Sequence, residues 1–510
     1  MNASDNAASW FADRHAAGPL AEKTAFRETG GRSLTYAALA SEAAKMAGLF
    51  AAHGIRREDR ALMLVLDTIE FPVVFWGAIK AGVIPIPVNT LLAAPVYDAI
   101  LRDSRARALF VSAPLYPAIA EILADQPFLE RIFVIGDDKP EGCFSFAAEH
   151  CGADAGETVP ASPDETAFWL YSSGSTGAPK GVMHVHGALK ATADTYGARV
   201  LGIREDDVIF SAAKLFFAYG LGNGMTFPMS VGATTILFPG RPTPADMFAA
   251  IDAERPTIFC GVPTLFAAMV AEMETNGARP DAPLRTCISA GEALPEEVGK
   301  GWKAGTGVDI LDGVGSTEML HIFLSNAPGD VVYGTSGGPV PGYEVKLVGE
   351  FGREPHPDEP GELLVRGASA ADGYWNQRDK SRRTFEGEWT RTGDKYTRDA
   401  AGRYVYCGRT DDMFKVSGIW VAPFEVEQAL GAHPRVLESA VVPKVDEEGL
   451  EKPQAFVVLK EGAGDEALRE ELKALVQDRA GKWKYPRWIE FVEDLPKTAT
   501  GKIQRFKLRA

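Results

Sequence analysis

A glycine-rich stretch, SSGSTGAPKG, runs from Ser172 to Gly181 and ends with Lys180 before its last glycine. Glycines let backbone amides curl around an anion, and hydroxyls and an ammonium can complete such a cradle. The stretch is neither a Walker A sequence nor a dinucleotide fingerprint, because it lacks both spacings. It follows a strand-like segment (166–173) and precedes a helix-like one (186–196), a placement that favours phosphate binding over an ordinary surface turn.

Five other short motifs follow the glycine-rich stretch in order. They are SAGEAL (289–294), GVGSTEM (313–319), TRTGD (390–394), GRTDDMFKVSGIWVAPFEVE (408–427) and PKTATGKIQR (496–505). Each motif alone is weak evidence. Together, the six resemble the adenylate-forming superfamily of acyl-CoA ligases, peptide-synthetase adenylation domains and luciferases, and the resemblance covers essentially the whole chain. It implies that ATP activates a carboxylic acid.

The resemblance implies that these motifs bind the nucleotide. Thr317 is expected to contact phosphate, and Glu318 to bind Mg²⁺, a hard cation that prefers oxygen ligands. Asp394 would accept the ribose hydroxyls. On sequence alone, Glu318 also fits a capping or surface acid, and Asp394 a tight turn. The full set of expected ATP or AMP contacts is Ser172, Ser173, Gly174, Ser175, Thr176, Lys180, Ala290, Gly291, Glu292, Asp312, Gly313, Asp394 and Arg409, with Thr176 as a second, weaker Mg²⁺ ligand.

Lys502 is the candidate cation that allows two anions, the carboxylate of the acid and the triphosphate of ATP, to approach each other. In this superfamily the acid attacks the α-phosphate of ATP and expels pyrophosphate, so positive charge is needed where negative charge develops. The alternative is a solvated lysine near a basic terminus. By resemblance, Lys502 lies on a small domain that swings about Asp411 and then presents a tunnel to CoA. The expected tunnel residues are Lys415, Ser417, Gly418 and Trp420, but Ile419 stands where many members have a second glycine, which leaves the tunnel's shape open.

Two apolar, aromatic segments, KLFFAYGLGNG (214–224) and MLHIFLSN (319–326), are expected to form the acyl pocket. Together with the segment that follows, they resemble benzoate–CoA ligases most. We therefore assign the ring pocket to Ala218, Tyr219, Gly220, His321 and Ile322, with Ala218 and Gly220 leaving room for a flat acid. The alternative for His321 is a hydrogen-bonded structural histidine, and the preferred ring substituents stay open.

These residues must be positioned by elements that alternate between strand-like and helix-like up to about Leu347, which predicts parallel α/β sheets. One example is a strand at 61–66, a helix at 70–81 and a strand at 83–87. From about 334 to 406 the sequence pattern predicts antiparallel strands or a barrel-like piece, and a small α+β unit follows. We predict a large domain of residues 1–410 and a small mobile domain of residues 411–510.

Composition limits the partners. The net charge of −16 argues against nucleic acid and anionic membranes. Asp67, Glu70 and Lys80 interrupt the most apolar stretch, so no membrane span is expected. Five scattered cysteines and an N-terminus without a signal-peptide pattern predict a cytoplasmic protein with reduced thiols. A homodimer is left open.

The leading hypothesis is an ATP-dependent aryl-CoA ligase that uses Mg²⁺, with an aromatic carboxylic acid, ATP and CoA as its partners. The alternative is a free-standing enzyme that adenylates an aryl acid and loads a carrier protein. Because the sequence ends soon after Lys502, we expect no carrier domain in cis. A regulator that binds nucleotide without catalysis is disfavoured by the joint presence of Lys180, Glu318, Asp394 and Lys502.

Overall fold

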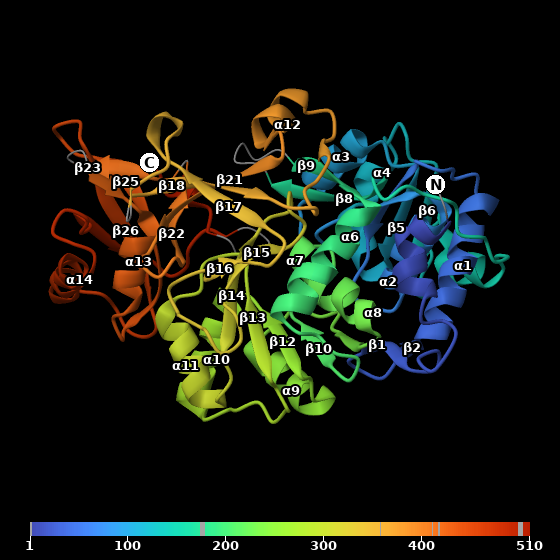
Figure 1. The fold of residues 1–510 in the computed structure, drawn as a ribbon, viewed down its shortest axis with the longest axis horizontal. Coiled ribbons are helices and arrows are strands. Elements are labelled where there is room, and N and C mark those ends of the chain that lie inside the picture. Colours follow the sequence, from blue (N-terminus) through green and yellow to red (C-terminus); the bar gives the residue numbers. More distant parts are fainter. Residues whose placement is uncertain are drawn as a thin grey trace.

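The computed structural model describes residues 3–173, 179–356, 359–410, 412–416, 419–497 and 503–509. The N-terminal helices lie at one end of the molecule, a group of sheets forms its centre, and the C-terminal elements lie at the opposite end (Figure 1). The order of elements confirms the predicted fold class: mainly parallel α/β sheets, then an antiparallel sheet, then a small α+β unit.

Two mainly parallel sheets form the framework of the large part. One has the order β4-β3-β5-β6-β7 and is parallel throughout. The other has the order β16-β15-β14-β13-β12-β10-β11-β1-β2, parallel from β14 to β1 and antiparallel at both edges. Their strands are β1 (Thr24–Glu28), β2 (Ser33–Thr35), β3 (Arg60–Leu64), β4 (Ile84–Pro87), β5 (Ala108–Ser112), β6 (Arg131–Ile135), β7 (Phe144–Ser145), β10 (Val208–Ser211), β11 (Thr234–Leu237), β12 (Ile258–Gly261), β13 (Thr286–Ser289), β14 (Ile310–Gly315), β15 (Ile322–Ser325) and β16 (Gly338–Pro339).

Helices connect these strands and cover the sheets (Figure 1). Those around the five-stranded sheet are α1 (Tyr36–Ala52), α2 (Glu70–Ala81), α3 (Ala94–Ser104), α4 (Ala120–Leu123) and α5 (Phe146–Cys151). Those that follow are α6 (His186–Thr192), α7 (Ala218–Leu221), α8 (Phe227–Val231), α9 (Pro244–Glu254), α10 (Pro263–Asn276) and α11 (Glu296–Thr306). π-Helical turns extend α6 over Ala193–Val200 and join α7 to α8 over Gly222–Thr226.

Helix α2 shows how closely sequence and structure agree in the core. Its sequence, EFPVVFWGAIKA, is apolar around almost its whole circumference, and Phe71, Phe75 and Trp76 are fully buried. Gly82 follows with φ of 72°, the left-handed conformation that ends many helices and that glycine adopts without strain. The helix predicted over 70–81 is confirmed with both of its bounds.

The two ends of the glycine-rich stretch lie on paired strands. Strands β8 (Thr166–Ser173) and β9 (Pro179–Val185) pair with β19 (Gly373–Tyr374) in an antiparallel sheet of order β19-β9-β8. The helix expected after the stretch follows as α6, and strand β9, which was not predicted, lies between them. Val182 and His184 are buried and alternate with the partly exposed Met183 and Val185, the period-two pattern of a strand.

The antiparallel piece predicted for the later part of the chain is a sheet of order β17-β18-β21-β20, with β22 also paired to β21. Its strands are β17 (Glu344–Val348), β18 (Gly361–Arg366), β20 (Phe385–Glu386), β21 (Trp389–Arg398) and β22 (Tyr404–Arg409). Helix α12 (Arg378–Thr384) connects β19 to β20 and contacts both strands. This sheet lies between the nine-stranded sheet and the C-terminal elements (Figure 1).

The C-terminal unit has its own small core. Its elements are β23 (Phe414–Val416), β24 (Ile419–Val421), α13 (Pro423–Gly431), β25 (Val436–Val445), β26 (Glu451–Leu459), α14 (Glu466–Arg479) and β27 (Trp488–Phe491). The two helices bury Val426, Leu430 and Leu472 against the sheet β25-β26-β27. Asp411 lies outside the described residues, so the boundary between 410 and 411 stays a prediction.

Two further observations bear on the expected environment. No helix in the described ranges is both long and apolar enough to cross a membrane. Four of the five cysteines, Cys143, Cys260, Cys287 and Cys407, are buried, as expected for structural thiols, and Cys151 is exposed.

Candidate active site

Three side chains from distant parts of the sequence meet beside the β8–β9 hairpin. Lys180 lies on β9 and donates from Nζ to Oε1 of Glu318 at 3.2 Å. Tyr374 on β19 donates its hydroxyl to the same oxygen at 2.8 Å, and Lys180 Nζ lies 3.4 Å from that hydroxyl. The pairing of β19 with β9 explains the meeting, because it sets Tyr374 opposite Val182.

The turn that carries Thr317 and Glu318 is fixed by its backbone. It follows β14, and Glu318 accepts the amide of Ala371 at 2.8 Å through its carbonyl. Leu320 has φ of 64°, an uncommon conformation for a residue with a side chain. This tight turn, together with the strand pairing, presents the Glu318 carboxylate to Lys180.

The electrostatics of this cluster favour an ionised carboxylate. Burial raises the pKa of Glu318, but the charge of Lys180 and the hydrogen bond from Tyr374 outweigh it, so the net shift is downward. Burial and the charge of Glu318 raise the pKa of Tyr374, so its hydroxyl stays a donor. Burial also lowers the pKa of the neighbouring His184 to about 4, which keeps that imidazole neutral.

Asp312 and Ser289 lie opposite each other at the carboxyl ends of β14 and β13. Both are buried. Burial raises the pKa of Asp312 well above its usual range. Ligands of α/β sheets bind beyond the carboxyl ends of parallel strands, so these groups are placed to receive one.

Asp394 and Arg409, two of the expected nucleotide contacts, lie on neighbouring strands. They are register partners in β21 and β22, and Arg409 Nη1 donates to Asp394 Oδ1 at 3.0 Å. Gly393 has φ of 73°, and a Cβ there would lie 2.7 Å from the Arg409 guanidinium. The charge of Asp394 raises the pKa of Arg409. The Asp394 carboxylate is therefore oriented before any ligand arrives.

The small C-terminal unit reaches this region through the residue that follows Lys502. Ile503 donates its amide to Oε1 of Glu292 at 3.3 Å, in the loop after β13. Arg505 forms an ion pair with Glu427 on α13 at 2.7 Å. The chain on the carboxyl side of Lys502 is therefore held both to its own unit and to the loop of Ala290, Gly291 and Glu292.

Three aromatic rings surround His321, and of these only Tyr219 was among the residues expected to hold the acid. Its imidazole lies between the rings of Tyr196, Tyr219 and Phe227, with centroid distances of 5.1, 5.8 and 4.6 Å. The hydroxyl of Tyr219 donates to the carbonyls of Ile288 and Gly261, which fixes this ring.

The imidazole of His321 is neutral. Burial lowers its pKa to about 3, and a backbone hydrogen bond at Tyr219 opposes that shift. Both the ring-pocket role and the alternative of a hydrogen-bonded structural histidine stay predictions.

Gly220 does not leave room for the acid, as we expected it to. A Cβ at this position would lie 2.0 Å from the carbonyl oxygen of Lys214, so the missing side chain makes room for backbone rather than for a ligand. Ile322 is fully buried at the start of β15, beside Gly313. Ala218, at the start of α7, is partly exposed and packs against the main core.

Several expected site residues lie outside the described residues. These are Gly174, Ser175, Thr176, Asp411, Ser417, Gly418 and Lys502; for Ser173, Lys415 and Trp420 the structure describes the backbone but not the side chain. Lys415 and Trp420 are register partners of β23 and β24. The roles of all these residues stay predictions.

Sequence reasoning missed Tyr374 and His184. Tyr374 belongs to a two-residue strand, so it shows no periodicity, and 194 residues separate it from Lys180. Only the pairing of β19 with β9 brings it into the cluster. His184 was hidden because β9 itself was not predicted; the alternation of Val182 and His184 with Met183 was the signal available.

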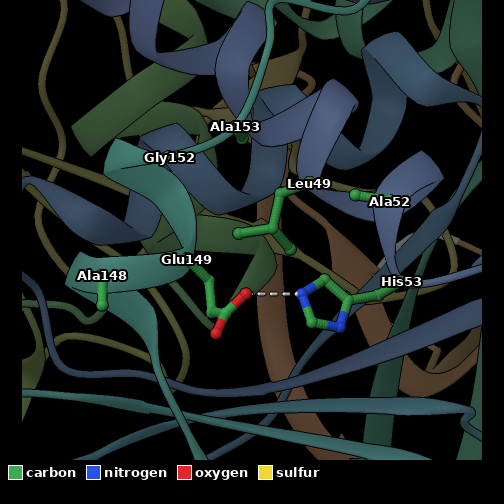
Figure 2. A pocket seen from close by; sticks show the side chains of 7 residues that line it. All are labelled: Leu49, Ala52, His53, Ala148, Glu149, Gly152 and Ala153. Atoms are coloured by element: carbon green, nitrogen blue, oxygen red, sulfur yellow. Dashed lines mark hydrogen bonds and ion pairs between the residues drawn. The ribbon is translucent and has the colours of Figure 1, made fainter.

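A separate hollow of about 190 Å³ lies between α1 and α5. Figure 2 shows His53 and Glu149 pointing toward each other there, and their side chains are joined at 3.0 Å. Small or apolar side chains form the rest of its wall. None of the residues of the Lys180 cluster or the His321 pocket lines it, so it is not part of the candidate active site.

Comparisons with known proteins agree with this geometry. The AMP-binding enzyme family matches residues 12–375, and the AMP-binding enzyme C-terminal domain matches residues 425–502. A 4-hydroxybenzoate–CoA/benzoate–CoA ligase of Rhodopseudomonas palustris is 51% identical over 99% of this chain and 94% of its own length. A benzoate–CoA ligase of Thauera aromatica is 56% identical over 90% of this chain and 86% of its own.

Comparison with a solved structure agrees with the family match and the sequence relatives. The benzoate CoA ligase of Burkholderia xenovorans LB400 superposes with a TM-score of 0.91 at 49% identity, and the match covers 99% of this chain and 100% of that one. Family match, sequence relatives and structure therefore agree over both parts of the molecule. The chain belongs to the AMP-binding enzyme family of adenylate-forming ligases.

Proposed function

We propose that this protein is an ATP-dependent aryl-CoA ligase that converts benzoate, or a close ring analogue, to its CoA thioester. The observation that carries the proposal is the contact between Lys180 and Glu318, three residues before the aromatic surroundings of His321. This contact supplies a cation suited to phosphate and a carboxylate suited to a metal ion near an apolar, ring-lined site. The relatives that share most of the chain are named for the same reaction.

In the first half-reaction, a carboxylate oxygen of the acid forms a bond to the α-phosphorus of ATP. The bond from that phosphorus to the bridging oxygen of the β-phosphate breaks, and pyrophosphate leaves with the electron pair. Lys180 stabilises the charge on the departing phosphates. Asp394, oriented by Arg409, accepts the ribose hydroxyls. Lys502 supplies the charge between the acid and the α-phosphate.

Glu318 fits the Mg²⁺ that this reaction uses. No group of three or more His, Cys, Asp or Glu side chains suited to a metal occurs in the described ranges. Mg²⁺ is commonly held by one or two carboxylates and the substrate's own phosphates, and the ionised Glu318 supplies such a ligand. When bound, the cation offsets negative charge on the phosphates.

In the second half-reaction, the thiol of CoA attacks the carbonyl carbon of the acyl-adenylate. The carbon–oxygen bond to AMP breaks, AMP leaves with the electron pair, and the thiol proton is released. We assign the approach of the thiol to the hairpin of β23 and β24, which includes Lys415 and Trp420. Rotation of the small domain about Asp411 brings this hairpin to the site.

The acid is recognised mainly by its ring. His321 is neutral and packs among three aromatic rings, so it extends an apolar wall while keeping a nitrogen able to bond a ring substituent. One relative accepts both benzoate and 4-hydroxybenzoate by name. We propose benzoate as the main substrate and 4-hydroxybenzoate as a second one. A cytoplasmic location and a homodimer stay predictions from the sequence.

A panel of acids tests the function. The purified full chain is given ATP, Mg²⁺ and CoA with benzoate, 4-hydroxybenzoate, 2-aminobenzoate or acetate, and AMP release is measured. We expect release with the aryl acids, dependent on both acid and CoA, and little with acetate. Release that ignores the acid, or that favours acetate, would contradict the proposal. Turnover with a carrier protein in place of CoA would support the alternative enzyme that loads a carrier.

A further inference from the structure

Helix α12 carries a concentration of positive charge that the fold does not neutralise. Its sequence, RDKSRRT, has four cationic side chains and one acid. In the described part of the chain, no carboxylate forms an ion pair with Arg378, Lys380, Arg382 or Arg383. By contrast, Arg391 on the adjoining strand β21 lies 2.6 Å from Glu362. The net charge of the protein is −16, so these cations form a local positive region on an acidic molecule. Such a region favours the binding of an anion.

The helix is attached to the Lys180 cluster. Tyr374 donates its amide to Oγ of Ser381 on α12 at 2.9 Å, so the ring of Tyr374 and the helix are fixed to each other. Nζ of Lys380 lies 6.0 Å from the centroid of that ring, and Nζ of Lys180 lies 4.7 Å from it. Burial and the charge of Lys180 lower the pKa of Lys380, which agrees with this proximity.

The cations border a hollow. It has a volume of about 540 Å³, within the usual range of small-molecule sites, and it is lined by Asn376, Gln377, Arg378, Asp379, Lys380 and Arg383. Amide, ammonium and guanidinium groups all donate hydrogen bonds, and guanidinium groups bind phosphate with two parallel ones. Arg382 lies on the same helix but does not line the hollow.

We propose that Lys380, with Arg378 and Arg383, binds pyrophosphate as it leaves the Lys180–Glu318 pair. The inference rests on the proposed function and adds binding residues to its first half-reaction. Lys180 is already in contact with the carboxylate of Glu318, so part of its charge is offset. Lys380 has no ion-pair partner among the described residues, so no contacting carboxylate offsets its charge on the side of the hollow. Pyrophosphate would pass from the inner lysine to the outer one.

The experiment uses Lys380→Gln in the full chain, with Arg382→Gln as the matched control on the same helix. Exchange of labelled pyrophosphate into ATP is measured with benzoate and Mg²⁺ and without CoA, as a function of pyrophosphate concentration. Loss of one charged contact corresponds to about a tenfold weaker binding. We therefore expect the half-saturating pyrophosphate concentration to rise about tenfold in Lys380→Gln. Arg382→Gln should match the wild type.

Further measurements distinguish binding of pyrophosphate from binding of CoA, and a binding role of Lys380 from a structural one. CoA also carries phosphates, so the KM for CoA is measured in the complete reaction; a rise in this value with unchanged pyrophosphate saturation would assign the cluster to CoA and overturn the proposal. Lys380→Arg keeps the charge and should restore pyrophosphate saturation, which a purely structural role of the lysine would not predict.

The same assay separates failure of this inference from failure of the function. An active enzyme in which Lys380→Gln and Arg382→Gln behave alike would overturn the inference alone. A wild-type chain without exchange dependent on an aryl acid would overturn the proposed function, and the inference with it.

Discussion

The side chains of Lys180, Glu318 and Tyr374 fix one another's positions through their mutual contacts. Burying an ion pair is unfavourable unless further hydrogen bonds satisfy it, and the Tyr374 hydroxyl supplies one to the carboxylate. The lysine and glutamate side chains are only 13% and 15% exposed, so solvent screens their interaction weakly. Each group therefore depends on the other two for its position before ATP binds.

Tyr374→Phe should slow adenylate formation without harming the fold. The change removes only the hydroxyl that bonds Glu318, and a hydrogen bond to a charged group contributes about 1.5–3 kcal/mol. We expect kcat of benzoate-dependent pyrophosphate exchange to fall about tenfold.

The matched control for this change is Tyr36→Phe, which removes a buried hydroxyl that donates to the carbonyl of Ala233. This variant should retain the wild-type kcat. Equal kcat values in the two variants would remove the Tyr374 hydroxyl from the mechanism.

At the scale of elements, the sequence predicts what local pattern determines and misses what pairing determines. Helix α2 is bounded by an apolar run and Gly82, both of which are visible in the sequence. Strand β9 was missed because its alternation is short and interrupted by Gly181. Tyr374 entered the site only through the pairing of β19 with β9, and no local signal reports such a contact. The motif residues Asp394 and Arg409 were found because each motif has its own sequence pattern.

The tight approach of α7 to the segment before it can be tested with Gly220→Ala. The added Cβ would lie 2.0 Å from the carbonyl of Lys214, and backbone cannot move aside as a flexible side chain can. We expect the variant to lose about 1–3 kcal/mol or more of unfolding free energy, measured by urea denaturation. The KM for benzoate should rise as well, since α7 carries Tyr219.

Gly338→Ala is the comparison for this prediction. Nothing lies within 4 Å of a Cβ at Gly338, so a methyl group there should leave stability almost unchanged. Similar losses in both variants would show that the strain at Gly220 is not specific.

Asp67 links the two parallel sheets and should make stability depend on pH. It follows β3, is 4% exposed and accepts the amide of Leu215 at 3.3 Å. Burial raises its pKa to about 6, against an opposing effect of the nearby Lys214 charge. Because the folded pKa lies above the unfolded value near 4, this group stabilises the fold most below pH 4. That contribution is lost as the pH rises through about 6.

Asp67→Asn removes this titration. Relative to the wild type, the variant should gain about 3 kcal/mol of unfolding free energy between pH 4 and pH 7.5, measured by urea denaturation at each pH. Parallel pH profiles for the two proteins would contradict the assignment.

At the scale of the whole molecule, some contacts between the large part and the C-terminal unit are polar contacts that can be broken and re-formed. Lys460 and Glu274 lie 3.9 Å apart and are largely exposed, a kind of pair that contributes little to stability. The hydrogen bond from Ile503 to Glu292 joins the segment after Lys502 to the loop beyond β13. Interfaces of this polar kind allow one domain to move against another.

Two variants should separate the half-reactions if this movement is part of the cycle. Lys502→Ala removes the cation that we propose serves only the first step, so adenylate formation should fall by about a hundredfold or more. Thioester formation from supplied benzoyl-adenylate and CoA should stay near the wild-type rate. Asp411→Pro stiffens the predicted hinge in the adenylating arrangement and should do the reverse, sparing pyrophosphate exchange and slowing thioester formation. Single-turnover assays of each step measure both effects, and equal losses in both steps for either variant would mean that one arrangement of the two domains serves the whole reaction.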